Sequence, residues 1–112
     1  MSLRIEKINE LLRQKLSQII SKELEFTPNS LVTITRVETS PDLKFCRIFI
    51  TVFPEHYRGT ALEILRKNSQ NLRKFLQGQM TTKFIPNLNF QIDEQEIFAT
   101  EVDKLLDEIN KG

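Results

Sequence analysis

The sequence is poor in the residues from which enzymatic sites are usually built. It contains one histidine, His56, and one cysteine, Cys46, so a catalytic Cys–His dyad could come only from this pair, and a zinc site lacks ligands. Its three glycines form neither a GxGxxG turn nor a P-loop, which argues against nucleotide hydrolysis. We therefore expect a protein that is not an enzyme and that needs no cofactor and no small-molecule substrate.

The sequence also lacks the marks of export. One cysteine cannot form an internal disulfide, and the first residues mix charged with apolar side chains instead of forming the apolar run of a signal peptide. No stretch approaches the roughly 20 consecutive apolar residues that span a bilayer. We expect an intracellular, soluble protein that does not contact a membrane.

The chain of 112 residues has no internal repeat, no low-complexity tract and no linker rich in glycine and serine. This length matches one domain, because domains commonly have about 100–150 residues. We predict a single domain over residues 1–112.

Charge is divided unevenly along the chain. Residues 1–90 contain 14 Lys/Arg and 8 Asp/Glu, whereas residues 91–112 contain 2 Lys/Arg and 7 Asp/Glu. A basic body with an acidic end suits a domain that meets a polyanion on one side. The alternative is that the charges simply cover solvated faces.

The first half of the chain predicts a helix followed by two paired strands. Apolar residues recur at steps of three and four over residues 4–24, as in an amphipathic helix. Residues 31–37 alternate and are β-branched, and residues 43–53 alternate over a longer stretch, so both are predicted strands. Ser40-Pro41-Asp42 marks the turn between them, and so short a connection favours antiparallel pairing.

The second half predicts two helices, a third strand and a last helix. A helical pattern begins at Thr60, but the polar residues 68–71 interrupt it, so we expect two short helices or one bent helix. Residues 83–92 are predicted to form a strand with Pro86 near its start, and a helix is predicted from about Ile97 to Ile109. The order α-β-β-α-α-β-α predicts an α+β fold in which helices cover the apolar face of a three-stranded sheet.

Individual side chains in this pattern have competing interpretations. Cys46 lies in the middle of a predicted strand, where a small buried thiol is favoured over a reactive one, and His56 is interpreted as a loop residue. Phe45, Phe49 and Phe53 share one strand face. They could form a stacking platform for bases, but the favoured interpretation is that they lie in the core or under a helix, because an exposed row would be an apolar patch.

The acidic residues Asp93, Glu94 and Glu96 could in principle hold a hard cation. The favoured interpretation is that they supply negative charge to the first turn of the last helix. We therefore predict no metal site.

Several pieces of the sequence, in the right order and spacing, resemble the ribosome-binding factor A family. Val37 to Leu43 matches the family's Val-Glu-x-Ser-x-Asp-Leu turn, with Cys46 where the family usually has alanine. Leu72-Arg73 matches a Leu-Arg or Ile-Arg step, and Ile85 to Phe90 is similar to an x-Pro-x-Leu-x-Phe strand entry followed by an acidic residue, here Asp93. With the opening helix, the resemblance covers roughly residues 4–108.

The resemblance implies a type II KH-like fold and a non-catalytic, RNA-binding role in ribosome biogenesis. The family binds the small ribosomal subunit late in its assembly, near the 5′-terminal helix of its RNA, supports processing of that rRNA, and in bacteria matters most in the cold. It is found in the bacterial cytoplasm and in organelles. Without a transit-like extension, this chain is expected to be cytoplasmic and bacterial, and we expect a monomer.

One departure from the family concerns the RNA-binding element. The family replaces the KH Gly-x-x-Gly loop with a helix–kink–helix that carries Ala-x-Gly, and the matching residues here are Asn68-Ser69-Gln70. Because glycine is missing, we expect Asn68 or Asn71 to adopt a left-handed conformation, and the kink to be shallower or displaced.

Cationic residues surround this polar insert and form the predicted RNA-binding surface. If the two helices are nearly collinear, Arg66, Gln70, Arg73 and Gln77 line one face. Phosphate groups favour both cations and the free amides of a helix N-terminus. A solvated helix face is the alternative interpretation. The predicted RNA-binding residues are Arg66, Lys67, Asn68, Ser69, Gln70, Arg73, Lys74 and Lys83.

Two other functions remain open from the sequence. The chain could be a protein–protein adaptor that uses the sheet or the acidic end without direct RNA contact, and such binding would survive nuclease treatment. It could also be a hydrolase that uses Asp93, Glu94 and Glu96 with a divalent metal. The turnover of such an enzyme would disappear in an Asp93→Asn variant. The RNA-binding assembly factor is the favoured hypothesis.

Overall fold

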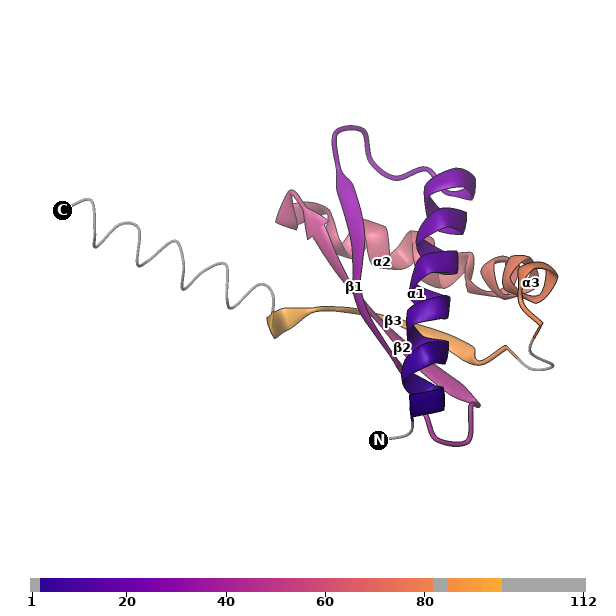
Figure 1. Ribbon diagram of the computed structural model, residues 1–112. Helices are drawn as coiled ribbons and strands as arrows, with labels where there is room; N and C mark the ends of the chain where they lie inside the picture. The colour runs from indigo at the N-terminus through magenta and orange to yellow at the C-terminus, as the bar shows by residue number, and fades with distance from the viewer. Residues whose placement is uncertain (1–2, 82–84, 96–112) are drawn as a thin grey trace.

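A computed structural model of the chain describes residues 3–81 and 85–95 (Figure 1). Along the chain these residues form a long helix, two strands, a single turn of 3₁₀ helix, two shorter helices and a third strand. The elements are α1 (Leu3–Glu23), β1 (Leu31–Thr39), β2 (Phe45–Phe53), η1 (Glu55–Tyr57), α2 (Arg58–Lys67), α3 (Ser69–Gln79) and β3 (Asn87–Ile92). None of the helices in these described ranges is long and apolar enough to span a bilayer.

The three strands form one sheet in the order β1-β2-β3, with β2 in the centre. β1 and β2 pair antiparallel, as predicted from their short connection, and β3 pairs parallel to β2. The predicted element order is confirmed for the described residues. The third strand starts at Asn87 and not at residue 83, and the predicted helix Ile97–Ile109 lies outside the described residues.

The turn between β1 and β2 is closed by side-chain hydrogen bonds. Asp42 Oδ1 accepts a bond from the Ser40 hydroxyl at 2.6 Å and one from the backbone N–H of Lys44 at 3.0 Å. Leu43 has a φ of 62°, a left-handed conformation that is uncommon for a leucine. The tight connection thus imposes a conformation that the residue itself does not favour.

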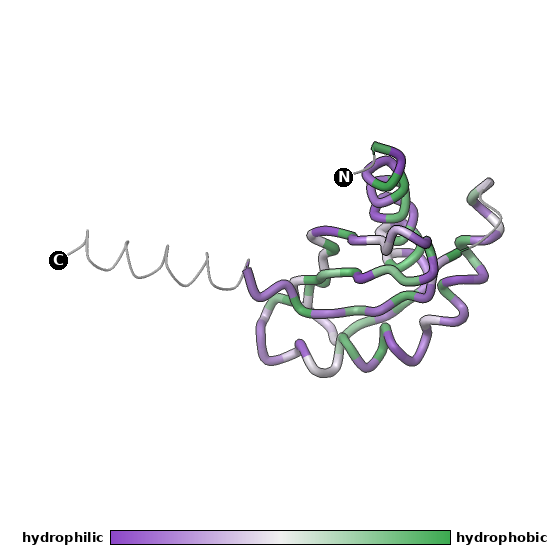
Figure 2. Tube along the Cα trace, turned by 90° about the horizontal axis from the view of Figure 1, so that it is seen from below, coloured by the Kyte–Doolittle hydropathy of each residue, from purple (hydrophilic) through white to green (hydrophobic). Residues whose placement is uncertain are grey.

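The three α-helices of residues 3–81 and 85–95 pack on one face of the sheet. The buried residues of β2 are Cys46, Ile48, Ile50 and Val52 at every second position, together with Phe49 on the opposite face. The alternating set meets an apolar stripe of α1, with α2 and α3 beside it. Figure 2 shows the matching alternation of hydrophilic and hydrophobic residues along the strands and around the helices. The amphipathic periods seen in the sequence therefore identify the covered face.

A bulge in β1 changes which residues face the core. The pairing with β2 shifts between Ile34 and Arg36, so Ile34 and Val37 are both buried although they are three residues apart. Thr35 is the extra residue. Its hydroxyl donates to an oxygen of Asp93 at 2.6 Å and lies 3.2 Å from the carbonyl oxygen of Phe49. The bulge is thereby tied to the end of β3.

The opposite face of the sheet is not covered by helices of the described chain, and this contradicts the interpretation of the phenylalanine row. Phe45 and Phe53 are 59% and 71% exposed, so the prediction that they are core or helix-covered is wrong. Phe49 is buried, but by the guanidinium group of Arg36, whose Cζ lies 3.9 Å from the ring centroid. The prediction failed because an alternating strand looks the same whether a helix or solvent lies over its second face.

Asp93 is a structural residue at the end of β3. It is 3% exposed, and its Oδ1 accepts a hydrogen bond from the backbone N–H of Gln95 at 3.1 Å, as a residue that caps a helix does. Arg36 Nε lies 3.6 Å from its Oδ2. Within residues 3–81 and 85–95, His, Cys, Asp and Glu side chains form no group of three that could hold a metal ion.

Cys46 is buried, as predicted, and burial raises the pKa of its thiol to about 11. We expect iodoacetamide to modify Cys46 slowly at pH 8 in the folded chain and rapidly in urea, because only the thiolate reacts. The unfolded thiol ionises first, so stability is unaffected by this group below pH ~8.5 and falls as the pH rises toward 11. Equal labelling rates with and without urea, measured by mass spectrometry, would contradict the buried position. A Cys46→Ala variant controls for modification elsewhere.

Candidate nucleic-acid interface

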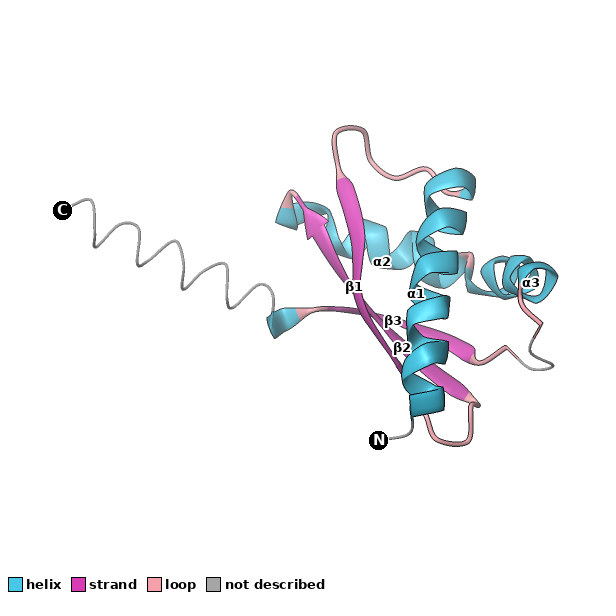
Figure 3. Ribbon diagram, in the orientation of Figure 1, coloured by secondary structure: helices cyan, strands magenta, loops and turns pink. Residues whose placement is uncertain are grey.

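The predicted RNA-binding residues lie around a bend between α2 and α3. Figure 3 shows two separate helices joined by a short connection, and in Figure 1 α2 is seen from the side while α3 is seen nearly end-on. The prediction of two helices meeting at the polar insert is confirmed, with Asn68 as the connecting residue. The helices are not collinear, so the face predicted for a straight helix is divided by the bend.

Asn68 forms the bend without a left-handed backbone. Its φ is −100°, and Asn71 is likewise absent from the residues with positive φ, so the predicted left-handed conformation is wrong. Both the backbone N–H and the side-chain Nδ2 of Asn68 donate to the carbonyl oxygen of Ile64, at 3.1 and 2.7 Å. Its own carbonyl accepts from Leu72 N–H at 3.0 Å, so one asparagine ends α2 and starts α3.

The two arginines of the interface lie along the strand side of the bend. Arg66 donates from Nη2 to the carbonyl oxygen of Phe90 at 3.2 Å, and Arg73 donates from Nη2 to that of Ile85 at 2.9 Å. Gln70 contributes an amide oxygen 3.5 Å from Arg73 Nη1. The structure therefore brings Arg66, Gln70 and Arg73 to the side of the helices that faces β3 and the residues before it.

The lysines are placed differently. Lys67 and Lys74 are exposed, and Lys74 lines a hollow of about 510 Å³ together with Asn68 and Asn71. Glu23 and Leu24, at the end of α1, form the opposite wall of this hollow. The cationic side chains thus flank the bend on both sides instead of forming a single row. Lys83 lies outside the described residues.

Acidic residues are missing from the whole segment that builds this surface. Between Ile64 and Ile92 the sequence has no Asp and no Glu, but it has five Lys and Arg. Within this segment no acidic residue offsets the positive charge; the nearest to the bend in sequence is Glu63, one turn before Arg66 and Lys67 on α2, and Glu23 on α1 is the acidic residue among those that line the hollow. Such a surface attracts a polyanion at long range, and the effect decreases with salt.

The side chains at this surface are of the kinds that can bind phosphate groups. Lysines are exposed, the arginines keep N–H groups beyond those bonded to the protein, and the first turn of α3 presents backbone amides of Ser69, Gln70 and Asn71 that have no side-chain cap. Serine, asparagine and glutamine side chains add neutral hydrogen-bonding groups. The arrangement suits structured RNA recognised through its backbone and shape.

Sequence reasoning missed two features of the interface. The carbonyl groups that hold Arg66 and Arg73 come from residues 85–90, and the wall formed by Glu23 and Leu24 comes from α1. Both depend on contacts between distant segments. The capping role of Asn68 is different, because asparagine at an interrupted helical pattern is a local signal that could have been read as a helix end.

The fold and the cationic bend define a class of protein. It is a small KH-like α+β domain of type II order with a polar, basic helix–bend–helix element. A model of the ribosome-binding factor A family matches residues 4–106. The chain belongs to this family.

Individual relatives agree with this assignment. The ribosome-binding factor A of Macrococcus caseolyticus is 30% identical over 112 residues, which cover 99% of this chain and 98% of that protein. The crystal structure of ribosome-binding factor A from Thermus thermophilus superposes with a TM-score of 0.70 at 24% identity, covering 79% of this chain and 93% of that one. A Thermus thermophilus ribosome-binding factor A fitted into the cryo-EM map of a 30S complex is similar with a TM-score of 0.65 and 25% identity, covering 74% and 88% of the two chains.

Proposed function

We propose that this chain is a ribosome-binding factor that binds the small ribosomal subunit and assists the late maturation and processing of its RNA without catalysing a reaction. The observation that carries the proposal is the acid-free segment that gathers Arg66, Lys67, Arg73 and Lys74 around the bend. The similar protein from Thermus thermophilus was fitted into a 30S complex, which supports the same partner here.

In the proposed mode of binding, the two kinds of cation have different tasks. Arg66 and Arg73 are held by carbonyl groups of residues 85–90, so each presents its remaining N–H groups to phosphates from a fixed position. Lys67 and Lys74 are exposed, and a lysine side chain is long and flexible, so in the proposed complex they adapt to the path of the RNA backbone. By family resemblance, we propose contact near the 5′-terminal helix of the RNA, a monomeric state and a cytoplasmic location.

The positions of two reactive side chains support the proposed non-catalytic role. The buried thiol of Cys46 is protonated at neutral pH because burial raises its pKa to about 11. His56 is exposed in η1, beyond the far end of β2, and the strand between them spans about 23 Å at 3.3 Å per residue. The two groups cannot act as a pair, so binding itself is the proposed activity.

Sedimentation of extracts tests the proposed partner. We expect the protein to migrate with free small subunits in a sucrose gradient and not with translating ribosomes. A chromosomal deletion in the source organism should accumulate precursor RNA of the small subunit, most strongly at low temperature, and the intact gene should reverse it. Migration with translating ribosomes, or subunit binding that persists after nuclease removes the RNA contacts, would contradict the proposal, and the second result would favour a protein–protein adaptor.

A further inference from the structure

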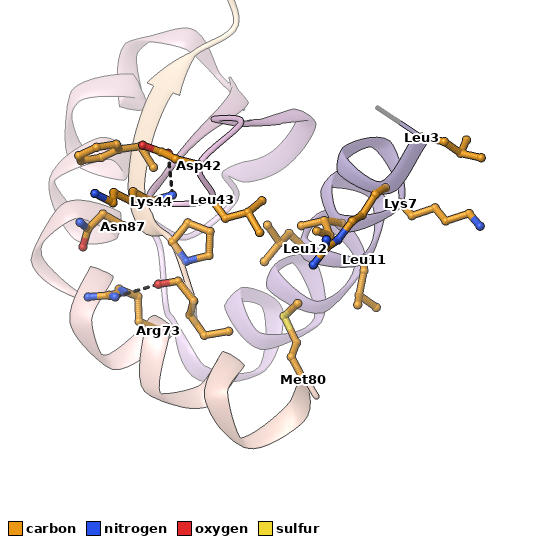
Figure 4. A pocket seen from close by; sticks show the side chains of 15 residues that line it. Leu3, Lys7, Leu11, Leu12, Asp42, Leu43, Lys44, Arg73, Met80 and Asn87 are labelled. Atoms are coloured by element: carbon orange, nitrogen blue, oxygen red, sulfur yellow. Dashed lines mark hydrogen bonds between the residues drawn. The ribbon is translucent and has the colours of Figure 1, made fainter. Parts of the chain in front are cut away.

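A second groove lies at the other end of the helical layer and shares Arg73 with the described residues of the bend interface. Its walls are the N-terminal half of α1, the turn between β1 and β2, the end of α3 and the start of β3, and its volume is about 970 Å³. Figure 4 shows α1 with Leu3, Lys7 and Leu11 on one side and Leu43, Lys44 and Arg73 on the other. Met80 lies between the two walls.

Exposed apolar residues of the described chain line this groove. Six large hydrophobic residues are exposed in residues 3–81 and 85–95, and two of them, Leu3 and Leu11 of α1, line the groove with their side chains. Leu43, whose backbone is left-handed, adds a third apolar side chain that points toward α1 in Figure 4. Contiguous apolar surface of this kind marks an interaction site more often than chance exposure does.

Cationic side chains surround the apolar surface. Arg4, Lys7, Lys44 and Arg73 line the groove, and the charged ends of Lys7 and Lys44 point outward in Figure 4. Asp42 is the acidic residue among the described residues that line it, and its carboxylate is already engaged by Ser40 and Lys44 N–H. The rim therefore favours a partner with carboxylates.

The backbone of the groove wall is not available to an added strand. Asn87 N–H donates to the carbonyl oxygen of Lys44 at 2.9 Å, and Ser40 N–H donates to that of Phe45 at 2.8 Å. A helical peptide satisfies its own backbone, so it needs no free backbone groups from these two places. The apolar walls also distinguish the groove from the interface at the bend, because phosphates gain nothing from contact with leucine and methionine.

We propose that this groove binds an amphipathic helix of a partner protein, with an apolar stripe that enters the groove and acidic residues that meet its cationic rim. This second activity does not rest on RNA binding at the bend. The helix inserts side chains at positions i, i+3, i+4 and i+7 between α1 and the turn, as in other helix-in-groove complexes. A protein that binds RNA at the bend and a protein helix at the groove would hold two components of an assembling particle together.

Titration of the isotope-labelled full chain with synthetic helical peptides tests this inference by NMR. The first probe has leucines at helical spacing and glutamates elsewhere, the second has lysines in place of the glutamates, and the third is a scrambled version of the first. We expect the acidic peptide to shift the amides of Leu11, Leu43 and Phe45 saturably, and the other two to bind at least about tenfold more weakly, since the charged flanks and the stripe both contribute.

Matched variants separate the groove from general surface effects. Leu11→Glu should weaken binding of the acidic peptide by more than about tenfold, whereas Leu31→Glu, at an exposed leucine far from the groove, should leave it unchanged. Lys7→Glu should weaken it about threefold and Lys22→Glu, on the same helix, should not. Both groove variants should retain RNA binding.

Three results would overturn the inference. Equal binding of the lysine peptide would remove the role of the cationic rim. Shifts of the same amides by an RNA fragment of the small subunit would assign the groove to nucleic acid. Shifts that depend on protein concentration alone would assign it to a second copy of the chain.

Discussion

Replacing Lys67 and Lys74 with glutamine is expected to flatten the salt dependence of binding to small ribosomal subunits. Each lost phosphate contact reduces the slope of log K against log salt by ~0.9, which corresponds to about eightfold in affinity at 0.1 M salt. The double variant should therefore bind tens of times more weakly at this salt concentration. Because the side chains of both lysines are exposed and make no hydrogen bond found among the described residues, the fold should not change.

Neutralising Arg66 and Arg73 as well extends this test, but the folding stability of these variants must be measured. Arg66 and Arg73 each donate a hydrogen bond to a backbone carbonyl. Their loss should therefore affect both the proposed RNA binding and the attachment of residues 85–90 to the helices. Adding Arg66→Gln and Arg73→Gln should flatten the slope further, by up to ~0.9 for each. The matched control neutralises Arg13, Lys15, Arg47 and Arg58, which carry the same total charge and line neither the bend nor the groove. An equal loss of slope in the control would show that net charge, and not the bend, governs binding.

Replacing Phe90 with alanine is expected to cost about 3–5 kcal/mol of folding stability, because a large buried aromatic side chain leaves a cavity that the core cannot fill. Phe90 is 0% exposed in the middle of β3, between the sheet and α2. Domains of this size are stable by roughly 5–15 kcal/mol, so the variant is expected to be close to unfolding at 37 °C. Urea denaturation followed by circular dichroism measures the change.

The exposed phenylalanine Phe45 provides the control for this prediction. It is 59% exposed on the uncovered face of the sheet, and Phe45→Ala should change stability by about 0.5 kcal/mol or less. If both variants lost the same stability, the assignment of the two sheet faces would be wrong. The comparison thus tests the fold at two phenylalanines that look alike in the sequence.

The sequence predicted the elements well because their signals are local. The stripe of α1, the alternation in β2 and the polar insert at residues 68–71 each determine a structure within one segment. The bulge at Thr35 was not predicted from these local patterns. Before the bulge the inward-facing residues are Val32 and Ile34, at even positions, and after it they are Val37 and Thr39, at odd positions. The sequence pattern predicts a single uninterrupted strand.

The candidate site could be predicted as a set of residues but not as a geometry. The cations near the polar insert follow from the sequence, and the structure places Arg66 and Arg73 together on the side that faces β3. Their anchoring carbonyls, the hollow beside α1 and the groove at the other end of the molecule all depend on how distant segments pack. No periodicity within one segment contains that information.

The way Asn68 closes the bend has a consequence for recognition. A glycine hinge would sample many angles between α2 and α3 and would surrender that freedom on binding. Here the amide side chain and two backbone bonds fix the angle in the free protein. Little conformational entropy then remains to be lost at this point, so in the proposed complex the bend keeps its angle and the RNA is the component that changes its conformation.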